Sequence, residues 1–230
     1  VIVPVLTMRT LSEERKQKTD QLLYALPIST TQVILGKYAA LLLVFLIPLC
    51  FVALYPLLFA QFGEVYLPTA YGSLFAFFLL GAALIAVGVF LSSLTDNQGL
   101  AAGLGIGAIL LNYYSVSLSE YVSSTAIGSL VTFAVLIVCL GLIIRALTRN
   151  DMLSIAVGLV LLAALIGVYA LDGTALEGLL PDIMKTLSLF SRFSVFVNGV
   201  FDLTGVVYFL SVTVFFLFLA VQSMEKRRYN

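Results

Sequence analysis

The chain of 230 residues is 61% hydrophobic and 10% charged, and its mean hydropathy is +1.12. Soluble domains carry roughly a quarter charged residues, so this composition excludes an ordinary soluble domain and indicates an integral membrane protein. The formal net charge of +0 gives no support to a nucleic-acid partner.

The first eight residues, VIVPVLTM, have the composition of the end of a spanning helix. We expect the beginning of that helix to lie upstream of Val1. On this expectation the N-terminal spanning helix of the protein is missing from the 230 residues.

Residues 9–37 form the only long polar segment of the chain. Within it, Thr10 and Glu13 have the spacing of a capping box, which predicts the start of a short helix. Pro27 is expected to end that helix because it cannot continue the backbone hydrogen bonding. Oppositely charged residues at i,i+4 spacing would support the helix, namely Glu14 with Lys18 and Lys16 with Asp20. One of three hydroxyl residues can then cap the next helix: Ser29, Thr30 or Thr31.

Six apolar runs predict full membrane spans, because each crossing needs about 20 apolar residues. They cover residues 38–62, 71–94, 126–147, 155–171 and 205–221, and a run that starts at residue 100 and reaches the more polar residues 112–124. Pro48 and Pro56 are expected to bend the first span. Residues 172–204 are too interrupted to cross and too apolar for a free linker, so we interpret them as an extracytoplasmic interfacial or re-entrant segment.

The distribution of Lys and Arg predicts the orientation, because positive charge gathers on the cytoplasmic side. If residues 9–37 are cytoplasmic, alternation of the spans places the turn at Asp96, residues 145–151 and the C-terminal tail on the same side. Ten of the twelve Lys and Arg residues then lie inside, leaving only Lys185 and Arg192 outside.

These features predict an all-α protein, a polytopic transmembrane helical bundle of about six full spans plus the tail of an earlier one. We assign one transmembrane domain to residues 1–230. Its parts are the end of a spanning helix (1–8), the polar cytoplasmic segment (9–37), the helical bundle (38–224) and a cytoplasmic tail (225–230).

Two features of the third span are candidates for a specific role. Gly99, Gly103 and Gly107 recur every four residues, and such a stripe lets another helix approach closely. A nucleotide loop is the poorer interpretation, because no strand precedes these glycines and no phosphate-binding Lys follows them. Asn112 is a candidate polar residue near a transport pathway, with an interhelical hydrogen bond as the alternative.

The predicted spans contain no group typical of catalysis. There is no histidine, and no acid or base lies deep inside a predicted span, as an intramembrane enzyme or an ion-driven transporter would need. Cys50 and Cys139 sit in apolar runs, where a small buried hydrophobe is the expected role. We therefore predict no catalytic residue and no metal ligand, and expect the energy source to lie outside this chain.

The polar segment at residues 9–37 then becomes the candidate site. A solvated loop is one interpretation of its charges. The alternative is a docking surface, because a capped helix followed by Leu22, Leu23 and Leu26 can bind a cytoplasmic protein. Chain continuity with the span after Lys37 would pass a push into the bundle.

Several blocks of sequence carry a resemblance to a known family. They are LTMR at residues 6–9, EERKQKTDQLL at 13–23, Pro27, ILGK at 34–37, LSSLTDNQ at 91–98, FDL at 201–203 and YFLS at 208–211. The chain resembles the ABC-2-type permeases over nearly its whole length, specifically their gliding-motility-like branch.

The resemblance implies the membrane subunit of an ATP-binding-cassette exporter in the inner or plasma membrane of a bacterial cell. A separate nucleotide-binding subunit would bind ATP and Mg²⁺, so this chain itself would be no enzyme and hold no cofactor. A second permease subunit, identical or different, would complete the transporter within the membrane lipids. The resemblance places a coupling helix within residues 9–37. Its contacts with the ATPase would be Glu13, Glu14, Arg15, Lys16, Lys18 and Asp20, with Leu22 and Leu23 packed at the base of the bundle.

A non-transporting membrane anchor that recruits a cytoplasmic protein through the same helix is the alternative function. The substrate is not assigned by the sequence, since the spans suit a lipid-like molecule, a peptide or a polysaccharide equally well.

Overall fold

The computed structural model describes residues 2–17, 19, 28–121, 125–148, 151–171 and 176–228, and every regular element in these ranges is a helix. The helices are α1 (Ile2–Thr7), α2 (Ser12–Lys16), α4 (Thr30–Val52), α5 (Tyr55–Phe59), α6 (Leu67–Leu94), α7 (Gln98–Tyr121), α8 (Ala126–Thr148), α9 (Asp151–Leu171), α10 (Leu179–Thr186), α11 (Leu189–Val197) and α12 (Leu203–Arg228). The predicted all-α class is confirmed.

Four helical segments are long and apolar enough to cross a membrane: Thr30–Phe59, Leu67–Leu94, Gln98–Tyr121 and Leu203–Lys226. The apolar helices α8 and α9 have 23 and 21 residues, which is also a spanning length. A helix satisfies its own backbone hydrogen bonds, as hydrocarbon requires. The structure is therefore that of a polytopic helical membrane protein.

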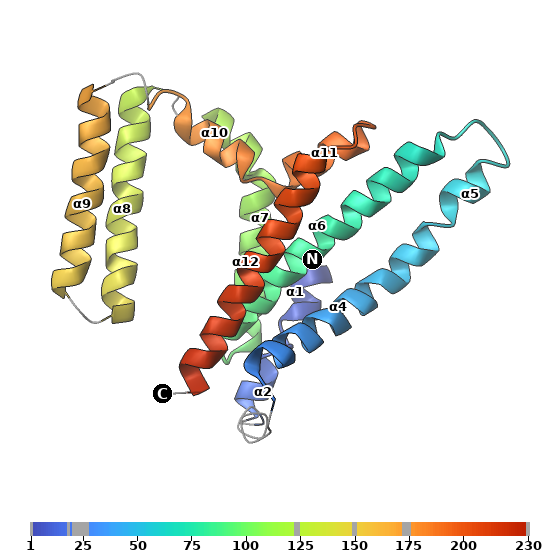
Figure 1. Cartoon of the computed structure of the whole chain (residues 1–230), viewed down its shortest axis with the longest axis horizontal. Coiled ribbons are helices and arrows are strands. Elements are labelled where there is room, and N and C mark those ends of the chain that lie inside the picture. Colours follow the sequence, from blue (N-terminus) through green and yellow to red (C-terminus); the bar gives the residue numbers. More distant parts are fainter. Residues whose placement is uncertain are drawn as a thin grey trace. The chain divides into compact units, whose positions relative to one another are not determined.

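The chain divides into two compact units, residues 1–113 with 189–230, and residues 114–188. In the first unit α6 is central: α12 packs along it, and α1, α4 and α11 also pack against it (Figure 1). In the second unit α8 and α9 lie side by side as a helical hairpin (Figure 1). The candidate site belongs to the first unit.

The centre of α6 contains several small buried residues, and they let its neighbours come close. They are Ala76, Gly81, Ala82, Ala83 and Ala86. Lipid tails are as apolar as a leucine side chain, so helices in a membrane associate through tight packing more than through exclusion of water. A run of alanines on α6 provides that packing for several helices at once.

Glycines on α6 and α7 mark close approaches between helices. A methyl group added at Gly81 would overlap the ring of Phe45 on α4. One added at Gly88 would lie 2.8 Å from the Thr7 Cβ, and one at Gly105 would lie 3.2 Å from the Pro4 Cβ. The short helix α1 is therefore wedged between α6 and α7.

The predicted glycine stripe on α7 meets no other helix of the described chain, so its role in helix packing stays a prediction. A methyl group at Gly103 or Gly107 would meet nothing within 4 Å, and one at Gly99 would meet only the Asn97 Oδ1 atom at 3.4 Å. The four-residue spacing places these three glycines on one face of α7, but it does not tell which face of α7 contacts a neighbouring helix. Gly105, on another face, makes the contact.

The first span begins and breaks as its residues dictate. Ser29 caps α4: its Oγ accepts from the Gln32 N–H at 3.2 Å, while the Gln32 Oε1 accepts from the Ser29 N–H at 3.1 Å. Pro48 lies inside α4, and Pro56 lies in the first turn of α5, just after α4 ends. Of the two predicted bends, the one at Pro56 coincides with an actual break between helices.

The interrupted segment after α9 forms two short helices, α10 and α11, within its described residues. Both are shorter than a membrane crossing needs. Its placement at a membrane surface stays a prediction.

Candidate functional site

The start of α2 is capped by a residue from α6. The Ser92 Oγ atom accepts from the Leu11 N–H and from the Ser12 N–H, each at 3.2 Å, and donates to the Met8 carbonyl at 3.3 Å. The first N–H groups of a helix have no partner inside it, so an outside oxygen stabilises them. Ser92 provides that oxygen from 80 residues farther along the chain.

The predicted capping box at Thr10 and Glu13 is therefore wrong. The N-cap of α2 is Leu11, which makes no side-chain cap bond. The Thr10 Oγ1 atom is buried without a hydrogen-bond partner among the described residues, and the Glu13 carboxylate accepts from the Gln17 amide at 3.4 Å. The physical reason is tertiary: Leu11 is only 2% exposed and packs into the core with Ile34 and Val89, which shifts the helix start by one residue.

The side chain of Arg15 points into the protein and binds the end of α6. It is 4% exposed, donates from Nη1 to the Ser93 carbonyl, and lies 4.0 Å from the Asp96 carboxylate. The last carbonyls of a helix lack partners within it and favour a cation. The Ser223 Oγ atom of α12 donates to the same carbonyl at 3.1 Å. One backbone carbonyl of α6 thus joins α2 to α12.

Lys37 connects α2 to the first turns of α4. Its ammonium group donates to the Thr10 carbonyl at 2.8 Å and forms an ion pair with Glu14. The Lys37 and Glu14 side chains are 20% and 33% exposed, so the pair is partly shielded from water. The predicted pairing of Glu14 with Lys18 stays a prediction, because Lys18 lies outside the described residues.

These contacts form one polar cluster, which we call the α2 junction. It consists of Met8, Thr10, Leu11, Ser12, Glu14, Arg15, Lys37, Ser92, Ser93, Asp96 and Ser223. Segments that the sequence placed on one side of the membrane do meet at one end of the bundle: α2, the turn after α6 and the C-terminal part of α12 (Figure 1).

The predicted ATPase contacts divide into three groups. Lys16 is exposed and Glu13 partly exposed, so both can meet a partner. Glu14 and Arg15 are engaged within the α2 junction, Arg15 from a buried position. The remaining predicted contacts lie outside the described residues: Lys18, Asp20, Leu22 and Leu23.

Asn112, the predicted candidate near a transport pathway, makes a hydrogen bond between helices. Its Oδ1 atom accepts from the Leu189 N–H at 3.0 Å, at the first residue of α11. An amide oxygen at this position stabilises a helix start. Asn112 thereby attaches α11 to α7, which is the interhelical role named as the alternative.

Sequence reasoning missed the two serines of α6 and Ser223 of α12. Ser92 and Ser93 are almost fully buried at the end of a long apolar helix. Adjacent hydroxyl residues at the end of an apolar span are a weak signal, because serine can also bond its own helix. Ser93 does so as well, donating from Oγ to the Phe90 carbonyl at 2.6 Å.

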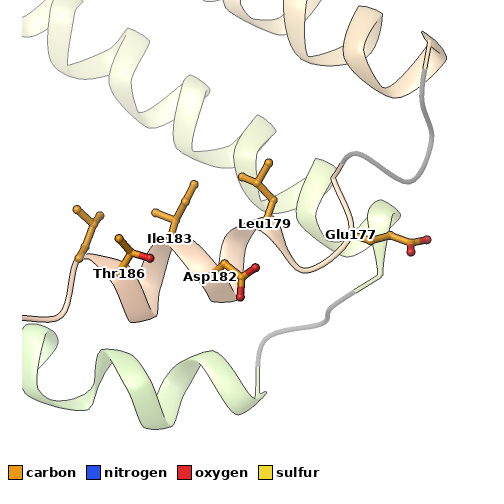
Figure 2. Close-up of a pocket in the computed structure, with 6 residues that line it drawn as sticks. Glu177, Leu179, Asp182, Ile183 and Thr186 are labelled. Carbon is orange, nitrogen blue, oxygen red and sulfur yellow. The ribbon is translucent and has the colours of Figure 1, made fainter. Parts of the chain in front are cut away.

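Hollows among the described residues also lie away from the α2 junction. A surface hollow of about 440 Å³ on α10 is lined by exposed Glu177 and Asp182 and by apolar residues such as Leu179 and Ile183, which project from one side of the helix (Figure 2). An apolar cavity of about 470 Å³ lies among α1, α4, α6, α7 and α11. Neither brings together groups for acid–base chemistry.

No group of three or more His, Cys, Asp or Glu side chains within the described ranges could hold a metal ion. The α2 junction itself contains hydroxyls, backbone carbonyls and paired charges. Such an arrangement fixes a short helix to a bundle, and it leaves the outward face of that helix open to a partner.

Comparison with protein families matches residues 1–118 to the family described as ABC-2 family transporter protein. No curated protein and no solved structure matches the chain. The matched region contains the whole α2 junction apart from Ser223.

Proposed function

The chain belongs to the ABC-2 family of transporter proteins and is a membrane permease subunit of an ABC transporter, and we propose that it works as an exporter driven through α2 by a separate ATPase subunit. The family implies an ATP-binding partner in general. The finer proposal is that this partner binds α2, supplies ATP with Mg²⁺, and moves the spans of this chain.

The observation that carries the proposal is the two-sided character of α2. Leu11 and Arg15 are buried and bonded to the bundle, while Lys16 is exposed on the same short helix. A helix held firmly on one side and charged on the other suits a part that receives a force from a neighbouring protein. A linker would not need an arginine buried against the end of another helix.

The orientation follows from the same end of the molecule. Arg15, Lys37 and the end of α12, with Lys226, lie at the α2 end of the first unit. Because Lys and Arg favour the cytoplasmic side of an inner or plasma membrane, we propose that the α2 end and the C-terminus lie in the cytoplasm. Two permease subunits, identical or different, would enclose the transport path.

A non-transporting anchor is the second candidate, and it would use the same exposed face of α2. An anchor needs only binding, whereas a permease must change the rate of ATP hydrolysis when it binds the ATPase. The two functions are therefore separated by measuring association and ATPase stimulation in the same preparation.

The experiment reverses charge on the exposed face of α2. Glu13→Lys and Lys16→Glu should reduce association of the ATPase subunit, and its permease-dependent hydrolysis in proteoliposomes, by about tenfold each, since like charges at an interface cost affinity. Glu64→Lys is the matched control, because Glu64 is exposed in the loop between α5 and α6. Normal association and stimulation in both α2 variants would contradict the proposal.

A further inference from the structure

We propose that Ser92, Arg15 and Ser223 make α2 and the ends of α6 and α12 one moving body, so that a displacement of α2 reaches α6 and α12 directly. This inference rests on the proposed function, because it concerns the route by which an ATPase bound at α2 would act. The three side chains are positioning residues: they hold α2, and they touch neither nucleotide nor substrate.

Both ends of α2 are attached to α6. Ser92 binds the backbone where α2 begins, at Leu11 and Ser12. Arg15, one residue before α2 ends, binds the Ser93 carbonyl. A short helix fixed at both ends to the same neighbour has no freedom to tilt against it.

The attachment of α2 to α6 extends to α12. Ser223 donates to the carbonyl that Arg15 also binds, at 3.1 Å. Near Ser223 along α12, Leu217, Ala220 and Met224 are buried in the same core as Leu11. A movement of α2 relative to α12 would break this packing as well as the bonds, and closely packed interiors resist such continuous deformation.

A competing route for the force runs through α4. Continuity of the chain from α2 to α4 would deliver the force to the first span instead. The polar side-chain contact between them is the partly exposed pair of Lys37 with Glu14, beside apolar packing of Ile34 in the core that also holds Leu11. Partly solvated ion pairs hold two elements less firmly than buried hydrogen bonds to backbone. The buried route to α6 is therefore the stiffer one.

The test measures distances in the complex of permease and ATPase subunit. Spin labels at Gln17→Cys, directly after α2 and outside the proposed ATPase contacts, and at Lys226→Cys, in a chain with Cys50 and Cys139 replaced by Ala, report the separation of α2 from the end of α12. We expect one narrow distance that is the same with and without an ATP analogue. In Ser92→Ala and in Ser223→Ala the distribution should broaden and shift when nucleotide binds.

The functional readout separates positioning from binding. Ser92→Ala should keep the affinity for the ATPase subunit and lose about tenfold in permease-dependent stimulation of hydrolysis, since two buried backbone N–H groups lose their acceptor. Ser73→Ala on α6 and Ser211→Ala on α12 are matched controls away from the α2 junction, and both should keep full stimulation. Ser223→Ala removes only the tie to α12, so it tests the proposal if Ser92→Ala fails to fold.

A nucleotide-dependent change of the Gln17 to Lys226 distance in the otherwise unaltered chain would overturn the inference. Loss of stimulation in Lys37→Met together with full stimulation in Ser92→Ala and Ser223→Ala would also overturn it, by assigning the route to α4. Failure of the ATPase subunit to bind the unaltered permease is a different result, because it contradicts the proposed function itself.

Discussion

At the scale of residues, the hydrogen-bonding capacity of Ser92 is fully used. A hydroxyl has one donor and two acceptor positions. Ser92 donates to the Met8 carbonyl and accepts from the N–H groups of Leu11 and Ser12. No water is needed to satisfy this oxygen, which suits a position that is 1% exposed. Replacing this buried hydroxyl would leave two backbone N–H groups without their acceptor.

The ion pair of Lys37 and Glu14 should make a measurable contribution to stability. In a double-mutant cycle of Lys37→Met and Glu14→Gln, the interaction energy should be about 0.5–1 kcal/mol, because the pair is only partly shielded from water. The measurement is thermal unfolding of the purified protein in detergent. Lys16→Met is the control, since Lys16 is exposed, and its coupling to Glu14→Gln should be near zero. Equal coupling at both lysines would contradict the observed pairing.

The close approach of α1 to α6 predicts different effects for two chemically identical substitutions. Gly88→Ala should destabilise the protein by about 1–3 kcal/mol, because the new methyl group would lie against Thr7 in a packed site. Gly103→Ala should be neutral or stabilising, since its methyl group meets nothing within 4 Å and alanine favours helix. Thermal unfolding compares the two. A larger loss at Gly103 than at Gly88 would refute the packing described.

At the scale of elements, hydropathy predicted the spans well because length and apolar composition alone determine what can cross a membrane. The contacts between elements were harder. The Thr10 and Glu13 pattern is local, and it could not show that the core draws in Leu11 and that Ser92 supplies the cap. The spacing of residues predicts contacts within one helix, but it does not predict contacts between residues that lie far apart in the sequence.

The same limit explains the glycines and Asn112. Spacing selected Gly99, Gly103 and Gly107, but helix approaches within the described chain occur at other glycines, such as Gly81, Gly88, Gly105 and Gly205. Composition marked Asn112 as polar within a span without telling what it binds. The core of the first unit, by contrast, follows from its apolar residues, and the polar segment at residues 9–37 does contain α2.

The attachment of α11 to α7 predicts a structural effect at Asn112. Asn112→Ala should lower stability by about 1 kcal/mol, because the Leu189 N–H loses its acceptor. Asn112→Asp should retain most of this stability, since a carboxylate also accepts the hydrogen bond and is stabilised at a helix N-terminus. Unfolding in detergent compares both with the unaltered chain. If Asn112→Ala leaves stability unchanged but alters substrate movement, Asn112 belongs to the pathway instead.

At the scale of the whole molecule, α2 is attached to one end of a bundle whose other end carries α5 and the loop before α6 (Figure 1). Helix α6 has 28 residues, so it extends about 42 Å from that loop to the α2 junction. A force applied at α2 would act at one end of a helix that spans the membrane. Movement at the other end would require α6 to move as a rigid lever.

The most direct measurement of whether α2 receives the ATPase is site-specific photocrosslinking in native membranes. A photoreactive amino acid at Glu13 on α2 should capture the ATPase subunit in high yield, and the same group at exposed Glu64 in the loop between α5 and α6 should not. Capture of the ATPase from Glu64, or from neither position in membranes that contain the assembled complex, would contradict α2 as the input of this transporter.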